Sequence, residues 1–368
     1  MCMPRRMPPA FAAPRSCAGI AGLLLALSAL ALPARVPAKS WHIEPDGSGE
    51  AATLQLAMAA AAEGDTLVLG AGVFRGAGNR DLDGLGKSLV IRSSALDPAA
   101  CIIDCEGSAA SPHRGLLLLS GEGTGFVLEA VTIMNGYAGE THDRAGGAMI
   151  IGAHASPVVR RCRFRENRAL NGGAVMCARG SPMFEDCVFE ENHAWAGGGA
   201  LAVTDNSFPL IEGCTFAGNV ADNGGAVSSA WSLPVLRQCT LVRNQALLGA
   251  GISSWYASTV MLENCLIVFS PLGRAVVCEG AGALLSCCDV FGNSAGDWAG
   301  CISGQGDQEG NLSADPLFCD LESGDYGLDQ DSPCASRPGC GLIGAWGVAC
   351  ASTGAESRSW GGLKALFR

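Results

Sequence analysis

The residues of this sequence best suited to contact a ligand recur at one position of a repeated block. Aromatic rings on neighbouring turns can stack on sugar rings, and flanking arginine and aspartate side chains can hydrogen-bond to hydroxyl groups. Such a column stands seven residues after the first glycine of each block: Ala153, Arg179, Asp205, Trp231 and Tyr256, with Trp255 adjoining. We interpret it as a candidate carbohydrate-binding surface. The alternative, that the rings only cover the edges of adjacent loops, stays open.

A second cluster of polar side chains precedes the repeated blocks. Glu140, His142 and Asp143 lie in a polar insertion and are further candidates for ligand contact. The other histidines stand alone in the sequence, and we interpret each as a surface or turn residue rather than a catalytic one.

The carboxylates form no pattern that assigns catalysis. Lyases and glycosidases that act on polysaccharides need carboxylates close together, to hold calcium or to transfer protons. Here Asp81, Asp83 and Asp104 precede the regular blocks, whereas Asp205 and Asp222 fall on different turns. We therefore assign no catalytic residue and favour a protein that is not an enzyme, with a lyase or glycosidase as the alternative. We expect no metal site and no cofactor, although an acidic chain is compatible with calcium.

The repeated block indicates the fold that must position these residues. The first four copies have a glycine-rich opening, then a proline, then Cys-x-Phe-x-x-Asn or a close form of it. The fifth is a decayed copy without the proline, and the cysteine-to-cysteine steps are 25, 27, 25 and 26. A fixed period of this size predicts a solenoid, in which each unit is stable only when it stacks on its neighbours. The five openings begin at Gly146, Gly172, Gly198, Gly224 and Gly249.

Two columns of the repeat, one of cysteine and one of asparagine, are best explained by contacts between coils. Stacked strands hold equivalent residues about 4.8 Å apart, which is longer than the Cβ separation of about 3.8 Å in a disulfide. We therefore expect a buried, reduced ladder of Cys162, Cys187, Cys214, Cys239 and Cys265. A side-chain amide can bond the backbone of its own turn and stack on the next amide, so we expect a structural ladder of Asn167, Asn192, Asn219 and Asn244.

Cysteines outside this ladder are candidates for disulfides. Cys319, Cys334, Cys340 and Cys350 lie in loop-rich sequence, and we expect two bridges among them. Cys101 with Cys105 is a weaker candidate pair.

The ends of the chain differ from the repeats. Arginines, the apolar run from Ala18 to Leu32 and small residues up to Ala38 predict a signal peptide over residues 1–38. We expect no transmembrane segment after its removal. We expect residues 39–350 to be one domain, with an N-terminal cap (39–75), irregular coils (76–145), regular repeats (146–300) and a C-terminal coil with a cysteine-rich cap (301–350). Apolar runs such as 126–133 predict strands, and residues 351–368 are expected to be a flexible tail.

The charge of the chain bears on its partners. The formal net charge is −11 at pH 7, and removal of the four arginines in residues 1–38 makes it −15. Binding of nucleic acid needs clustered Lys and Arg to neutralise phosphates. We therefore expect no nucleic-acid partner, and we expect a monomer.

The repeat also resembles a known family. Gly172-Gly173-Ala174 followed by Phe189 and Asn192, at a constant period, resembles the repeats of chlamydial polymorphic outer membrane proteins. From Trp41 to Cys350 the chain resembles exported bacterial proteins of the pectin-lyase-like class. This resemblance implies an all-β, right-handed parallel β-helix with a short N-terminal capping helix, secreted or at the cell surface. It implies a non-catalytic binding or adhesion module for polysaccharide, or alternatively a structural surface component.

Overall fold

The computed structural model describes residues 37–139 and 145–351 of the 368-residue chain. The chain divides into two units, Met1–Pro37 and Ala38–Arg368, and all the coils belong to the second. Glu140, His142 and Asp143, and nearly all of the predicted signal peptide and tail, lie outside the described residues.

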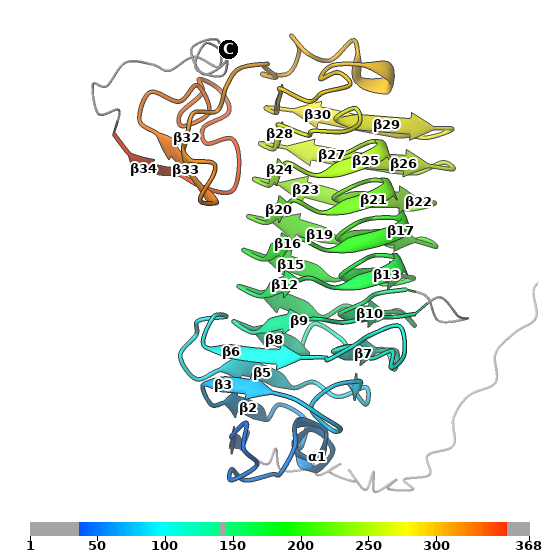
Figure 1. Cartoon of the computed structure of the whole chain (residues 1–368), viewed down its shortest axis with the longest axis vertical. Coiled ribbons are helices and arrows are strands. Elements are labelled where there is room, and N and C mark those ends of the chain that lie inside the picture. The colour runs from blue at the N-terminus through cyan, green and yellow to red at the C-terminus, as the bar shows by residue number, and fades with distance from the viewer. Residues whose placement is uncertain (1–36, 140–144, 352–368) are drawn as a thin grey trace, which may run out of the picture. The chain divides into compact units, whose positions relative to one another are not determined.

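The second unit is a stack of coils whose strands pair in parallel with the equivalent strands of the coils before and after (Figure 1). A regular coil contributes one short strand in turn to sheets that we name C, A, B and D, which confirms the predicted all-β solenoid. Sheet A consists of β1 (Ser40–Ile43), β2 (Thr66–Leu69), β5 (Val90–Ser93), β8 (Val127–Glu129), β11 (Val158–Arg160), β15 (Met183–Glu185), β19 (Leu210–Glu212), β23 (Val235–Arg237), β27 (Thr259–Glu263) and β30 (Gly282–Ser286).

The other three sheets of the stack follow the same order. Sheet B consists of β3 (Gly72–Phe74), β6 (Cys101–Asp104), β9 (Thr132–Met134), β12 (Arg163–Arg165), β16 (Val188–Glu190), β20 (Thr215–Ala217), β24 (Thr240–Val242), β28 (Leu266–Val268) and β31 (Asp289–Phe291). Sheet C consists of β4 (Leu82–Asp83), β7 (Leu116–Leu118), β10 (Met149–Ile151), β14 (Val175–Ala178), β18 (Leu201–Thr204), β22 (Val227–Ala230), β26 (Ile252–Trp255) and β29 (Val276–Glu279). Sheet D consists of β13 (Arg168–Asn171), β17 (His193–Gly197), β21 (Val220–Asn223) and β25 (Gln245–Leu248).

Apolar columns of the repeat lie in register inside the coils. Phe164, Phe189 and Phe216 are successive partners in sheet B, and their rings stack with centroid distances of 4.9 and 4.7 Å. All three side chains are fully buried. Full burial of such a side chain contributes about 1.5–3 kcal/mol, so contacts between coils, rather than any single three-residue strand, stabilise the stack.

The asparagine ladder is also fully buried. Nδ2 of Asn192 donates to Oδ1 of Asn219 at 3.0 Å and to the carbonyl oxygen of Phe164 at 2.9 Å. Its Oδ1 accepts from the backbone N and from Nδ2 of Asn167, both at 3.0 Å. Each amide therefore satisfies polar groups of two neighbouring coils that burial would otherwise leave without partners.

The five cysteines of the predicted ladder are buried thiols, and Cys288 continues their column. The Sγ of Cys187 donates to the carbonyl oxygen of Val159 at 3.4 Å. Burial raises the pKa of the Cys187 thiol well above its ordinary value, so this side chain stays protonated and fills the core as a small apolar group. Cys101 and Cys105 are likewise buried thiols, so the weaker predicted pair is not a disulfide.

Tight corners separate the strands of a coil. Ala130 has a φ of 55° and lies between β8 and β9, so the run 126–133, predicted as one strand, is two strands on different sheets. Ala130 and Val131 are fully buried, and the polarity of the sequence therefore gives no sign of this corner.

A short helix, α1 (Leu54–Ala60), lies next to the first coil. The Thr53 side chain accepts from the backbone N of Leu56 at its start, and Leu54 and Met58 are buried in the main core. At its end, Nζ of Lys87 donates to three carbonyl oxygens, those of Met58, Ala59 and Ala61, each at 2.8 Å. A lysine at a helix C-terminus satisfies carbonyl groups that lack partners within the helix.

The last strand of sheet A is covered by the chain that follows it. Gln305 accepts from the backbone N of Leu285 and donates to the carbonyl oxygen of Ala283, both at 2.9 Å. The amide thereby occupies hydrogen-bonding groups that an exposed sheet edge would offer to another chain. A disulfide between Cys278 and Cys301 joins β29 to the 3-10 helix η1 (Gly300–Ile302) in the same region.

The C-terminal segment forms a small sheet beside the upper coils in Figure 1. Its strands are β32 (Phe318–Asp320), β33 (Asp325–Asp329) and β34 (Val348–Cys350). Nε1 of Trp346 donates to Oγ1 of Thr215 at 2.8 Å, and the backbone N of Ala345 donates to Oγ1 of Thr240 at 3.0 Å. The segment thus packs against the side of sheet B, over several coils.

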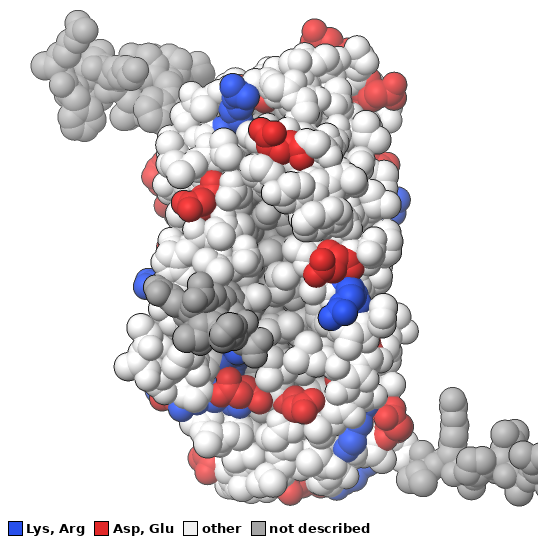
Figure 2. Space-filling view, turned by 90° about the vertical axis from the view of Figure 1, so that its right-hand side faces the viewer, with Lys and Arg blue, Asp and Glu red and all other residues white. Residues whose placement is uncertain are grey.

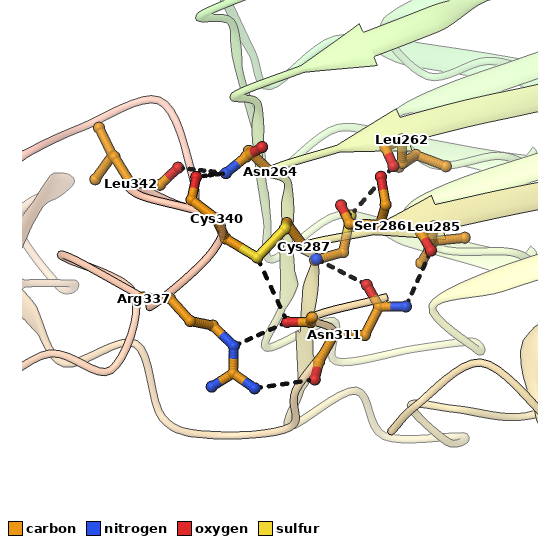
Figure 3. Close-up of a disulfide and its surroundings, with 11 residues drawn as sticks. Leu262, Asn264, Leu285, Ser286, Cys287, Asn311, Arg337, Cys340 and Leu342 are labelled. Carbon is orange, nitrogen blue, oxygen red and sulfur yellow. Dashed lines mark hydrogen bonds between the residues drawn. A yellow bond between two sulfur atoms is a disulfide. The ribbon is translucent and has the colours of Figure 1, made fainter. Parts of the chain in front are cut away.

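Disulfides secure this segment, and one of them joins two of the four predicted cysteines. Cys319 pairs with Cys350 within the small sheet, whereas Cys340 pairs with Cys287 of the last coil. Figure 3 shows the second bridge beside Asn264, whose Nδ2 donates to the carbonyl oxygens of Cys340 and Leu342, both at 2.8 Å.

Cys334 is a buried thiol, so the predicted second bridge among the four cysteines is wrong. Its Sγ lies 3.2 Å from Oδ2 of Asp289, which is also buried. The Cys334 thiol thus has a carboxyl group as its partner in place of a second sulfur. Burial raises the pKa of Asp289 to about 7.

Charge is sparse on one face of the molecule. Figure 2 shows Lys, Arg, Asp and Glu there in small groups separated by wide uncharged areas. Within the described ranges, no helix is long and apolar enough to cross a membrane.

Candidate functional site

The predicted binding column lies at the corner where each coil leaves sheet C. Arg179, Asp205, Trp231 and Tyr256 directly follow β14, β18, β22 and β26. All four have left-handed backbone, with φ of 58°, 59°, 48° and 46°. Such a conformation costs about 1–2 kcal/mol for a non-glycine residue, and the stacked coils hold each of them in it. The structure therefore brings the four predicted residues into one column.

The two aromatic members of this column form a stacked pair. The rings of Trp231 and Tyr256 have centroids 4.6 Å apart and planes inclined by 12°. They remain 52 % and 55 % exposed. Trp255 lies beside them, with its ring centroid 6.2 Å from that of Tyr256. Each ring of the pair thus uses one face against the other, so only their outer faces can contact a ligand.

The outer face of Tyr256 is directed toward a position without a side chain. Trp255 pairs with Glu279 in sheet C, so Gly280 is the next member of the column after Tyr256. A Cβ atom added to Gly280 would meet no atom within 4 Å. We name Trp231, Tyr256 and the space above Gly280 the aromatic platform. Gly280 was not predicted because the sequence after the copy that begins at Gly249 no longer follows the repeat.

Carboxylates flank the platform on both sides. Asp205 is the member of the column before Trp231, and Glu279 pairs with Trp255; both are exposed. Their oxygens can accept hydrogen bonds from ligand hydroxyl groups. Arg179 lies three coils from Tyr256, which is about 14 Å at the spacing of paired strands. Only an extended ligand could contact Arg179 and Tyr256 together.

A serine ladder behind the corner was not recognised in the sequence. The backbone N of Ser207 donates to Oγ of Ser232 at 3.1 Å, and Oγ of Ser258 donates to the carbonyl oxygen of Ser232 at 2.6 Å. All three are buried. Their steps of 25 and 26 residues were the signal that could have revealed them. These bonds fix the corner, and with it the backbone that carries the platform.

Other predicted sites are not assembled in the described residues. Across 37–139 and 145–351, no group of three or more His, Cys, Asp or Glu side chains is placed to hold a metal ion. Binding of calcium stays a prediction, and so does a role for the insertion.

A match to a family model agrees with the architecture. Residues 100–267 match a family model described as "Right handed beta helix region". A solved structure titled "Crystal structure of pectate lyase Pel9A" is similar, with a TM-score of 0.43 and 13% identity, over 84% of this chain and 96% of that chain. No curated protein matches the sequence. The parallel sheets, the stacked coils and the match to residues 100–267 identify this chain as an all-β, right-handed parallel β-helix protein.

Proposed function

We propose that this protein binds polysaccharide at the aromatic platform and does not cleave the glycan there. The observation that carries the proposal is the exposed Trp231–Tyr256 stack with open space above Gly280. A stacked pair is a rigid apolar surface on which the C–H face of a sugar ring can pack. Because the corner is fixed by the coils, little conformational entropy is lost when a ligand binds.

The flanking charges favour an uncharged ligand. Asp205 and Glu279 can accept hydrogen bonds from hydroxyl groups, but they repel the carboxylates of polyuronates. The net charge of −15 that remains after removal of residues 1–38 adds to this repulsion. Neutral polysaccharides are therefore the ligands that we propose.

We also propose that the protein acts outside the cell or at its surface. Its disulfides Cys278–Cys301, Cys287–Cys340 and Cys319–Cys350 support export, since such bonds persist in oxidising compartments. Cell fractionation with intact-mass measurement tests this proposal. A cytoplasmic protein that retains residues 1–38 would contradict it.

Binding is tested with chain 39–368 on a panel of insoluble neutral polysaccharides and polyuronates, with and without calcium. We expect retention on a neutral polysaccharide, about tenfold weaker in Tyr256→Ala, because lost stacking amounts to about 1.4 kcal/mol. Gly280→Asn should weaken retention similarly, because asparagine tolerates left-handed backbone and places its side chain over the ring.

Leu247→Ala is the matched control. Leu247 is 65 % exposed on β25 of sheet D, away from the corner column, and its truncation should leave retention unchanged. Equal retention of the wild type and the three variants would show that the platform is not part of the binding surface. Release of unsaturated or reducing-end products would contradict binding without cleavage.

A further inference from the structure

A serine, a histidine and an aspartate form a hydrogen-bonded chain in the irregular coils. Nδ1 of His113 lies 2.6 Å from Oδ2 of Asp81, and Nε2 of His113 lies 2.9 Å from Oγ of Ser111. Ser111 is exposed, and the His113 ring is partly buried. These contacts were not predicted, and the interpretation of His113 as an isolated residue is wrong, because Asp81 and His113 are 32 residues apart in coils without a regular period.

Backbone contacts position each of the three residues. Asp81 immediately precedes β4. Its Oδ1 accepts a hydrogen bond from the backbone N of Arg114, and its backbone N donates one to the carbonyl oxygen of Arg114, both at 2.7 Å. The carbonyl oxygen of His113 accepts from the backbone N of Tyr137 at 2.7 Å. Ser111 ends a tight turn in which the backbones of Ser108 and Ser111 exchange two hydrogen bonds.

The order of these contacts sets the positions of the protons. A carboxylate can only accept, so Asp81 keeps the imidazole proton of neutral His113 on Nδ1. Nε2 then carries a lone pair directed at the hydroxyl of Ser111. This is the arrangement in which a histidine can remove a proton from a serine nucleophile while a carboxylate orients the ring.

We propose that Ser111, His113 and Asp81 form a hydrolytic site for carboxylic esters with a small acyl group, such as acetyl esters. Oγ of Ser111 attacks the ester carbonyl carbon as its proton passes to Nε2 of His113. The bond from that carbon to the alkoxy oxygen then breaks, and the same proton passes to the leaving oxygen. Water attacks the resulting serine ester and gives its proton to Nε2. When the serine bond breaks, that proton returns to Oγ, and the net products are an acid and an alcohol.

The turn also carries donors for the charge that develops on the carbonyl oxygen. The backbone N–H groups of Ala109 and Ala110 donate to none of the residues that the structure describes, and both residues are exposed. Such donors typically stabilise the transition state of acyl transfer. Because Ser111 is exposed, the site suits an ester displayed on the surface of a larger molecule. The site does not use the aromatic platform, so this proposal does not rest on glycan binding.

The test uses chain 39–368 with two probes, a fluorophosphonate and p-nitrophenyl acetate. We expect the fluorophosphonate to label Ser111, and peptide mass spectrometry locates the label. We expect Ser111→Ala to hydrolyse the acetate at least about 100-fold more slowly than the wild type. Ser48→Ala is the matched control, because Ser48 is an exposed serine whose Oγ donates to a carboxylate, that of Asp46, at 2.6 Å. Its rate and labelling of Ser111 should equal those of the wild type.

Asp81 is a positioning residue and has its own readout. Asp81→Asn should lower kcat at least about tenfold with little change in KM, because the amide can hold the wrong imidazole tautomer. The Asp81→Asn variant should unfold at a temperature close to that of the wild type, which shows that its coils remain folded. Absence of label on Ser111, or equal hydrolysis by the wild type and Ser111→Ala, would overturn the proposal. Hydrolysis that persists in Ser111→Ala but disappears in His113→Gln would assign the reaction to the imidazole alone and would overturn it too.

Discussion

Asn192 illustrates how single residues stabilise the coil stack. Its side chain takes part in four hydrogen bonds with two neighbouring coils. Asn192→Ala removes all four and takes from the buried backbone N–H of Asn167 its acceptor. At about 1 kcal/mol for each bond, we expect the free energy of unfolding to fall by about 4 kcal/mol.

Asn223→Ala provides the comparison for this prediction. Asn223 is only half-buried, and its Nδ2 donates to the carbonyl oxygen of Ala196 at 3.2 Å. Its loss should lower the free energy of unfolding by about 1 kcal/mol. Equilibrium urea unfolding of both variants measures the difference. Equal losses would contradict the role assigned to the ladder.

Residues that recur at a constant step were predictable, and those in contact across irregular sequence were not. Asn192 and Cys187 revealed their roles because like residues stand at the same position of neighbouring blocks. Cys287 and Cys340 are 53 residues apart and share no period. The contact of Asp81 with His113 spans an irregular coil in the same way. Spacing carries information only where the backbone repeats.

At the scale of elements, Asp289 makes the contact between β31 and the C-terminal segment sensitive to pH. Burial raises the pKa of its carboxyl from 3.8 to about 7, and nearby Asp297 and Asp315 act in the same direction. Its ionised form is therefore disfavoured in the folded protein. The stability that this group contributes is fully present below about pH 4 and is lost as pH rises to about 7.

Asp289→Asn should remove this dependence, because an amide has the shape of the protonated acid and does not ionise. We expect the unfolding temperature of the wild type to fall relative to the variant between about pH 4 and pH 7, and the difference to stay constant above that. Differential scanning calorimetry over this range measures it. Parallel curves for the two proteins would contradict the assignment to Asp289.

The elements of the repeat were predictable, whereas the C-terminal segment was not. The sequence indicated that this segment is rich in cysteine, but it did not indicate that Trp346 reaches Thr215 on the side of sheet B. Such a contact depends on the surface that neighbouring coils build together, which no local pattern describes. Corners with buried residues, such as Ala130, could not be predicted for a local reason. Their residues are as apolar as those of the flanking strands, so the sequence shows no break between the two strands.

At the scale of the whole molecule, the stack is built from units that can be removed one at a time. Deletion of residues 172–197 joins Asn171 to Gly198 and removes one coil, since Gly172 and Gly198 are equivalent. We expect a folded protein with native-like circular dichroism and a reduced free energy of unfolding. Deletion of residues 172–184 is the control. It removes half a coil, puts every later column out of register and should prevent folding. Equal behaviour of the two deletions would contradict a stack of equivalent coils.

The most direct test of the proposed function is a calorimetric titration of chain 39–368 with soluble oligosaccharides of a neutral polysaccharide that retains it. We predict saturable binding by the wild type and by Leu247→Ala, and binding at least about tenfold weaker by Gly280→Asn, which keeps both rings but fills the space above Tyr256. Equal affinity of Gly280→Asn and the wild type would contradict the assignment of the platform as the binding surface.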